Sequence, residues 1–170
     1  MVITPVAVQV RRALASIADP EIPMASIVEL GMIEGVEVYA DHIRVELLPT
    51  FVGCPALEVI AASIRDRLAG FGREVEVSVD FATPWTSDRI TPAGRAQLRR
   101  AGFAPPPEVP VGRGLAMLDA PGIGGDAAPV ACPYCGSLRT TMESAFGPTQ
   151  CRSVHHCAAC RQPFEAFKAI

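Results

Sequence analysis

Hydrophobic residues recur along the first hundred positions with two different periods. A spacing of three to four residues follows Pro5 and returns after Pro55, and a third segment begins with Thr91-Pro92. A proline in the first turn is a common helix start, and each segment runs into a proline or a glycine. The sequence therefore predicts three helices, ending by Pro20, at Gly70 and at Gly102.

Between these segments the period falls to two. Apolar and polar residues alternate at 36–38 and 43–47, on either side of an Ala40-Asp41 turn, and again at 75–81. Such alternation is typical of strands with one buried face. The order helix, strand, strand, helix, strand, helix predicts an α/β fold, a small α/β sandwich whose helices pack on a three-stranded sheet. A short helical turn is also expected from Ser26 to Leu30.

The composition changes at Ala104. Residues 104–129 contain six prolines and five glycines, too many for a packed element. We therefore expect a first domain at 1–103, a linker at 104–129 and a small second domain at 130–170. An apolar island inside the linker, at 115–118, can dock on either domain or on a partner, and docking on its own chain is the favoured interpretation.

The last segment carries the clearest chemical signal, two Cys-x-x-Cys knuckles. Cys132 and Cys135 form the first, Cys157 and Cys160 the second, with 21 residues between them. Two facing knuckles surround one ion with four thiolates, which is a common structural site for zinc. We expect a β-rich zinc ribbon with three strands. Because so short a segment buries little apolar surface, the metal is expected to supply about 10–16 kcal/mol of folding energy.

Other side chains of the tail leave alternatives open. Cys151, a possible extra ligand, can be a bystander in a strand, a replacement for one of the four ligands, or the fourth ligand of an iron-sulfur cluster, and zinc is the favoured metal. At least one of His155 and His156 is expected to be a solvated strand residue. Four aromatic residues are expected to pack around the site: Tyr134, Phe146, Phe164 and Phe167.

The charge distribution argues against nucleic acid as a partner. The net charge is −3, and residues 130–170 carry only four basic and two acidic side chains, an excess that four thiolates around a divalent ion cancel. No apolar run approaches the roughly 18 residues of a membrane span, and no signal-peptide pattern opens the chain. We expect a cytoplasmic protein, with no membrane partner and with cysteines that bind metal rather than form disulfides.

Three residues of the first domain are candidates for chemistry. Cys54 is expected at or just before a helix start, a position that stabilises a thiolate, so it can act as a nucleophile or hold a metal transiently. The alternative is a small buried cap residue. Asp19 and Glu21 share a loop with two prolines, where Asp19 can cap a turn and Glu21 can be solvated. Trp85 is expected to anchor an edge of the core.

Together these motifs resemble a known family. The segments at 19–23 (DPEIP), 26–33 (SIVELGMI) and 49–55 (PTFVGCP), with Trp85 and Asp88, resemble the domain shared by SufT and the eukaryotic factors that target iron-sulfur clusters to recipient proteins. That resemblance spans residues 1–102. With the tail motifs at 132–137, 146–151 and 163–168, the whole chain resembles the PaaD family, small subunits encoded with the phenylacetyl-CoA epoxidase of aerobic phenylacetate degradation.

The resemblance implies a non-catalytic accessory subunit that matures or delivers the iron-sulfur or metal centre of the oxygenase or reductase. It implies that Cys54 contacts the cluster or metal, with Asp19 and Glu21 beside it. It implies structural zinc in the ribbon, a transient iron-sulfur cluster as cargo, and other epoxidase subunits as partners, especially the iron-sulfur reductase or the di-iron subunit. A structural subunit without metal delivery is the alternative. The chain lacks the Glu-x-x-His pair of a di-iron subunit.

Overall fold

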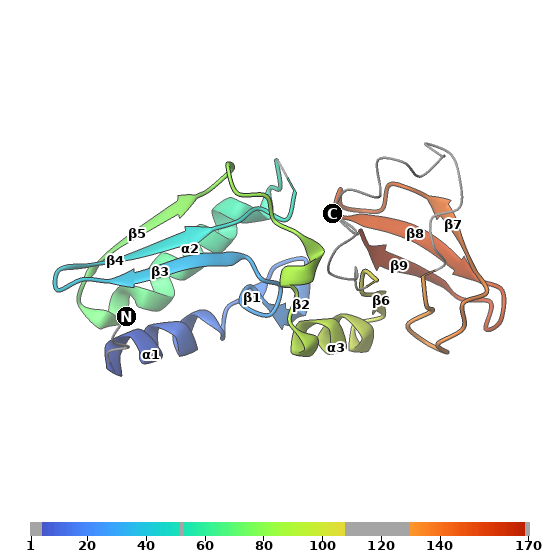
Figure 1. Ribbon diagram of the computed structural model, residues 1–170, viewed down its shortest axis with the longest axis horizontal. Coiled ribbons are helices and arrows are strands. Elements are labelled where there is room, and N and C mark those ends of the chain that lie inside the picture. The colour runs from blue at the N-terminus through green and yellow to red at the C-terminus, as the bar shows by residue number, and fades with distance from the viewer. Residues whose placement is uncertain (1–4, 52, 108–129, 169–170) are drawn as a thin grey trace. The chain divides into compact units, whose positions relative to one another are not determined.

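The computed structural model describes residues 5–51, 53–107 and 130–168. The chain divides into two compact units, Met1–Ala101 and Gly102–Ile170, and each has a sheet of its own (Figure 1). The first unit contains, in chain order, α1 (Pro5–Leu14), β1 (Ala18–Asp19), β2 (Ile22–Ser26), β3 (Ile33–Val38), β4 (His42–Leu47), α2 (Ala56–Leu68), η1 (Ala69–Phe71), β5 (Glu74–Val79), η2 (Ser87–Arg89) and α3 (Pro92–Arg100). The predicted α/β fold and its element order are confirmed, and the hairpin β1–β2 is an addition.

The sheet of the first unit has the strand order β3-β4-β5. β3 and β4 form an antiparallel hairpin, whereas β4 and β5 are parallel, so the chain must cross over between them, and α2 is that crossover. The residues of β4 that face the core, Ile43, Val45 and Leu47, are completely buried. α2 packs on β5 and α1 packs on both α2 and β3, so the two helices share the apolar face of the sheet.

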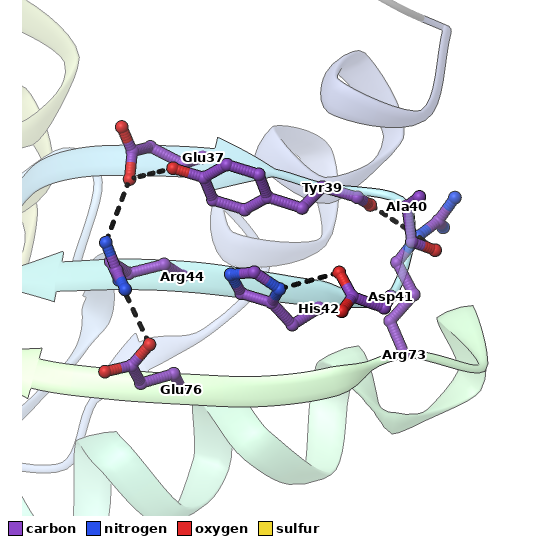
Figure 2. A network of polar contacts seen from close by, with 8 residues as sticks. All are labelled: Glu37, Tyr39, Ala40, Asp41, His42, Arg44, Arg73 and Glu76. Carbon is purple, nitrogen blue, oxygen red and sulfur yellow. Dashed lines mark hydrogen bonds and ion pairs between the residues drawn. The ribbon is translucent and has the colours of Figure 1, made fainter.

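The opposite face of this sheet is polar (Figure 2). Arg44 lies between two carboxylates from neighbouring strands, 3.0 Å from Glu76 and 3.6 Å from Glu37. Near the hairpin turn the ring of Tyr39 stacks on that of His42 at 4.3 Å between centroids. Because the charged groups are about half exposed, these ion pairs contribute little to stability, and the face is a solvated surface.

A closed turn follows β2 and has the predicted helical character. The N–H of Leu30 donates to the carbonyl of Ser26 (2.9 Å), as in one turn of helix. Ser26 and Glu29 cap it reciprocally: the N–H of Ser26 donates to the Glu29 carboxylate (2.9 Å), and the N–H of Glu29 donates to the Ser26 hydroxyl (3.1 Å). This is a capping box, which satisfies both backbone donors at the start of the turn.

The same turn anchors the segments that follow β5. The indole N–H of Trp85, only 3% exposed, donates to the carbonyl of Leu30 (3.0 Å), and the N–H of Thr91 donates to the carbonyl of Glu29 (2.9 Å). Gly94 packs so closely that a Cβ there would collide with the Glu29 carbonyl oxygen. Trp85 therefore anchors the core edge, as expected, through a buried hydrogen bond.

The second unit contains β6 (Phe103–Ala104), β7 (Thr140–Ser144), β8 (Arg152–Cys157) and β9 (Pro163–Phe167) in the sheet order β6-β9-β8-β7. The three strands expected in the tail are present. β6 is an additional strand that pairs in parallel with β9, and Ala104 is completely buried in the core of the ribbon. The proline-rich composition that begins at Ala104 hides this two-residue strand. The apolar island at 115–118 lies outside the described residues.

The aromatic residues of the tail divide into two pairs. Phe164 and Phe167 are each 4% exposed and belong to the ribbon interior, as expected. Tyr134 and Phe146 are 57% and 76% exposed, so the expectation that they pack around the metal site is wrong. Phe146 lies in the connection between β7 and β8, where the ammonium of Lys168 sits 5.0 Å from its ring centroid.

Candidate functional site

The structure brings the four knuckle cysteines together. Their sulfur atoms all lie within 4.8 Å of one another, and the Cys132–Cys160 and Cys135–Cys157 pairs are each 3.7 Å apart. A disulfide would require about 2.05 Å. A tetrahedron with metal–sulfur bonds of about 2.3 Å has sulfur–sulfur edges of about 3.8 Å. The spacing of these four sulfurs therefore fits a zinc ion.

Both knuckles have the same backbone hydrogen bonds. The N–H of Gly136 donates to the carbonyl of Cys132 (2.9 Å), and the N–H of Arg161 donates to the carbonyl of Cys157 (2.8 Å). Each turn requires a positive φ after its second cysteine, 72° at Gly136 and 59° at Arg161. Glycine adopts this conformation without strain, whereas arginine does not. Arg161 is the one non-glycine residue with positive φ in the part of the chain that the structure describes.

The four knuckle cysteines, Cys132, Cys135, Cys157 and Cys160, form what we call the cage. Their thiols differ in pKa. The backbone N–H of Cys160 hydrogen-bonds the Cys157 sulfur and lowers its pKa to about 6, whereas burial raises the pKa of Cys160 to about 12. Four thiolates at these distances repel one another, so a divalent cation is needed to hold them all in the charged form. Cys132 and Cys157 are buried and Cys135 is exposed, so the cage meets solvent on one side.

Cys151 lies outside the group of four sulfurs. Its side chain is buried and its sulfur lies 3.2 Å from the hydroxyl of Thr149. Its carbonyl accepts a hydrogen bond from the N–H of Lys168 (2.9 Å), just beyond β9. The structure thus places Cys151 in the framework of the sheet and does not bring it to the cage.

The two histidines of β8 have different surroundings. His155 is 6% exposed, stacks on Phe164 and has its Nε2 2.9 Å from the hydroxyl of Ser153. Burial lowers the pKa of His155, which favours the neutral ring. His156 is half-buried on the other face of the strand. Neither histidine belongs to the group of four cysteines that could share a metal ion.

Cys54 lies just before the start of α2, as expected. The helix begins at Ala56 with Pro55 as its N-cap, so the proline lies one position before the first helical residue. The carbonyl of Cys54 accepts a hydrogen bond from the N–H of Leu57 (3.3 Å), which fixes the residue at the helix start. Cys54 is half-buried, and Gly53 before it has a φ of 84° with open space where a Cβ would lie.

Topology gathers the motifs of the first unit at one end of its sheet (Figure 1). β4 and β5 are parallel, so the segment 49–55, which we call the Cys54 loop, and the loop before Trp85 follow the same end of the sheet. At that end the N–H of Asp80 donates to the carbonyl of Leu47 (2.8 Å). The antiparallel β3 starts there, so the capped turn before it lies at the same end. The carboxyl ends of parallel strands are the usual position for ligand sites in such folds.

Asp19 ends β1, and Glu21 lies in the turn between β1 and β2. Asp19 is 8% exposed, and its Oδ1 accepts hydrogen bonds from the N–H groups of Glu21 (2.8 Å) and Ile22 (3.1 Å), so it caps the turn. Glu21 is half-buried. Within 5–51, 53–107 and 130–168 the four ribbon cysteines are the one group of three or more ligand side chains close enough to share an ion. Among these described residues, Cys54, Asp19 and Glu21 do not form such a group.

The residues that hold this end of the sheet together were missed from the sequence. Ser26 and Glu29 have the spacing of a capping box, a signal that was available. The close approach of Gly94 to Glu29 had no local signal, since the two residues are far apart in the chain. Among the described residues, no helix combines the length and hydropathy that crossing a bilayer requires.

Two family models match the chain. The model described as an iron-sulfur cluster assembly protein matches residues 7–79, and the one described as the PaaD zinc beta ribbon domain matches residues 119–168. With four close cysteines inside the second match, the tail is a zinc ribbon.

Several solved structures are similar to the chain. A domain of unknown function from Bacillus anthracis is 24% identical, with 53% of this chain and 88% of that chain covered and a TM-score of 0.49. A conserved hypothetical protein from Thermotoga maritima is 24% identical, with 58% and 98% covered and a TM-score of 0.48. A Mycobacterium tuberculosis protein associated with iron-sulfur complex assembly and repair is 30% identical, with 58% and 87% covered and a TM-score of 0.35. The family assignment does not depend on them.

A curated relative covers nearly the whole chain. It is a protein of Escherichia coli (strain K12) assigned as a subunit of 1,2-phenylacetyl-CoA epoxidase, 36% identical over 158 residues. The match covers 92% of this chain and 89% of the relative. The relative spans both matched regions, the assembly domain and the PaaD ribbon. Both units therefore belong to a single family. The chain belongs to the PaaD family of phenylacetyl-CoA epoxidase subunits.

Proposed function

We propose that the chain is a non-catalytic accessory subunit of the phenylacetyl-CoA epoxidase system that matures or delivers the iron-sulfur or metal centre of the oxygenase or reductase. The observation that carries this proposal is the pairing of an iron-sulfur assembly domain with a PaaD ribbon along one chain. The E. coli relative is assigned as an epoxidase subunit, and this supports a role in the same system. A purely structural subunit would leave the assembly domain without a task.

Cys54 is the proposed contact for the cargo. Iron-sulfur clusters take about four thiolate ligands, and within the part of the chain that the structure describes Cys54 is not a member of a group of three or more ligand side chains. Asp19 and Glu21 lie in the hairpin that leads into the capped turn, and we assign them a supporting role. A cluster held by one protein ligand is incompletely coordinated, which suits cargo that has to leave.

The zinc cage is proposed to be separate from this transfer. Four cysteines complete the coordination of a structural zinc, so the ion has no open position for a substrate. Its role is to fold the ribbon, which we assign as a docking module for other epoxidase subunits.

A cysteine enzyme is the less suitable interpretation of Cys54. A nucleophilic cysteine needs a base within hydrogen-bond reach. The one histidine of the first unit, His42, opens β4 and contacts Asp41, whereas the Cys54 loop follows the far end of that strand. Five residue steps of strand separate the two ends, about 17 Å.

The test compares the metal content of each epoxidase subunit produced together with the wild-type chain, with Cys54→Ser, or without the chain. We expect the iron-sulfur reductase or the di-iron subunit to lose iron to the same degree with Cys54→Ser as without the chain. Cys151→Ser, a change of another cysteine outside the cage, is the matched control and should leave the iron unchanged. Full iron in every subunit without the chain would exclude delivery.

A further inference from the structure

Exposed apolar side chains lie at the Cys54 end of the first unit. Phe81 is 64% exposed and Val59 is 53% exposed, and Phe51 in the Cys54 loop is half-buried. Single exposed apolar residues are common on protein surfaces, whereas several at one end of a fold indicate contact with another molecule.

The topology explains why these residues are neighbours. Phe81 follows the end of β5, and the Cys54 loop follows the end of β4, which is the adjacent parallel strand. α2 starts at this end and packs on β5. Val59 lies in its first turn, and side chains of a helix lean toward its N-terminus, which directs Val59 toward the Cys54 loop.

The same end of the unit is acidic. Residues 45–64 and 77–88 contain no lysine or arginine, and together they carry four carboxylates: Glu46, Glu58, Asp80 and Asp88. The arginine that follows Asp88, Arg89, is paired with Glu34 at 2.6 Å, so its charge is matched by a carboxylate. Glu58 is exposed beside Val59, and Asp80 adjoins Phe81. The arginines of α2 are in its last turn, at Arg65 and Arg67, so they lie at the opposite end of the helix.

We propose that these residues, which we name the Cys54 rim (Phe51, Glu58, Val59, Asp80 and Phe81), form the docking surface for the protein that receives the cargo. The partner surface is apolar at its centre and edged by lysine or arginine. This inference rests on the proposed function, because it places the docking surface around Cys54. Seating an apolar partner there would exclude water from the thiol during transfer.

The charge of the rim selects this occupant over two others. In a symmetric dimer the same surface meets itself, so a second copy of the chain would bring the carboxylates of both rims together. Nucleic acid binding depends on lysine and arginine contacts to phosphates, and the rim has none. A protein with a basic edge gains attraction from the same carboxylates, both in encounter and in orientation.

The experiment measures binding of the full-length chain to the separately purified iron-sulfur reductase subunit and di-iron subunit, with biolayer interferometry at two salt concentrations. Phe81→Ser with Val59→Ser should raise the Kd for one of these subunits about tenfold or more, because both apolar contacts are lost. Glu58→Lys should also raise the Kd, and the increase should be larger at low salt than at high salt.

Matched substitutions elsewhere serve as controls. Val8→Ser changes an exposed valine near the start of α1, and Phe146→Ser changes an exposed phenylalanine of the ribbon. Both should leave the Kd unchanged. Unchanged thermal unfolding of the rim variants would show that the surface and not the fold was altered.

Three results would overturn the proposal. These are an unchanged Kd for the rim variants, an equal loss with the control variants, or a dimer of the chain in light scattering that the rim variants abolish. The proposed function is tested apart from this. If Cys54→Ser lowers iron in the recipient and the rim variants bind normally, delivery stands and the docking surface does not. If the rim variants lose binding and Cys54→Ser changes no iron content, the surface stands and delivery does not.

Discussion

The zinc cage and the Cys54 end of the first unit both present cysteine thiols, but only the cage has a complete set of metal ligands among the described residues. The cage places four sulfurs within 4.8 Å of one another, two of them buried. Cys54 is a half-buried thiol that belongs to no such group among the residues that the structure describes. A complete ligand set retains its metal and becomes part of the fold, whereas an incomplete one leaves positions for a partner's ligands. In the proposed function the cage keeps its metal, whereas Cys54 holds its cargo only during transfer.

The two regions also differ in what stabilises them. The buried cluster of the ribbon consists of Ala104, Cys132, Cys157, Phe164 and Ala166, so two of its five members are metal ligands. The first unit has an apolar core from its helices and sheet, together with a hydrogen-bonded turn at the Cys54 end. The ribbon should therefore depend on metal for its fold, and the first unit should not.

Removing the metal gives the largest expected effect. A strong chelator, or Cys132→Ser, should unfold the ribbon, since structural zinc contributes about 10–16 kcal/mol in comparable small domains. Amide NMR spectra with a zinc assay should show the signals of the second unit collapsing while those of the first persist. Cys151→Ser, outside the cage, should keep one zinc per chain. Loss of both units on chelation would remove the distinction between them.

Gly94→Ala should destabilise the first unit and leave the zinc ribbon intact. A Cβ at this position collides with the carbonyl of Glu29, so α3 or the capped turn must shift, at a cost of about 1–3 kcal/mol. Chemical denaturation followed by Trp85 fluorescence should report the loss, with zinc content unchanged. Ala93→Gly, at the exposed position before it, is a control for helix propensity alone. A zinc loss in Gly94→Ala would mean that the units are not independent.

Ser26→Ala tests the turn itself. It removes the hydroxyl that accepts from the N–H of Glu29, and side-chain caps of this kind contribute about 1 kcal/mol. Urea midpoints of the first unit should fall accordingly. Ser26→Thr keeps the hydroxyl and should restore most of the stability. An unaltered midpoint for Ser26→Ala would show that the Trp85 and Thr91 hydrogen bonds hold the turn without its cap.

Arg161→Gly is the smallest change and acts on the cage. It relieves the left-handed strain after Cys160, and the greater freedom of glycine in the unfolded chain offsets part of the gain. We expect the zinc-loaded ribbon to be stabilised by about 0.5–1 kcal/mol. The release of zinc to a chromogenic chelator should slow. Gly136→Ala, at the equivalent position of the other knuckle, should accelerate it, because φ there is 72°.

Much of this architecture could be predicted from the sequence. Local periodicity identified the helices after Pro5, Pro55 and Pro92, and paired knuckles identified the cage. Both signals lie within short segments, where spacing along the chain determines which side chains face one another. The position of Cys54 before α2 followed from its neighbouring proline in the same way.

Features set by contacts between distant segments could not be predicted. β6 has two residues and is stabilised by pairing with β9, about sixty residues further on in the chain, so its own pattern carries no signal. Phe146 and Phe164 are the same residue type, with the same general preference for burial, yet their side chains are 76% and 4% exposed. The difference arises because one lies in a connection and the other in a central strand of the ribbon sheet.

The pairing of β6 with β9 means that the ribbon is assembled from two separate stretches of chain. β6 ends at Ala104, and the next strand of the sheet among the described residues is β7. Val130, before β7, packs against the buried cluster of the ribbon, and its carbonyl accepts the Thr140 hydroxyl at 2.7 Å. A tail fragment cut at Pro129 would thus lack an edge strand and expose the β9 backbone to intermolecular pairing. An expression boundary for the isolated ribbon belongs at Gly102, where the second unit begins.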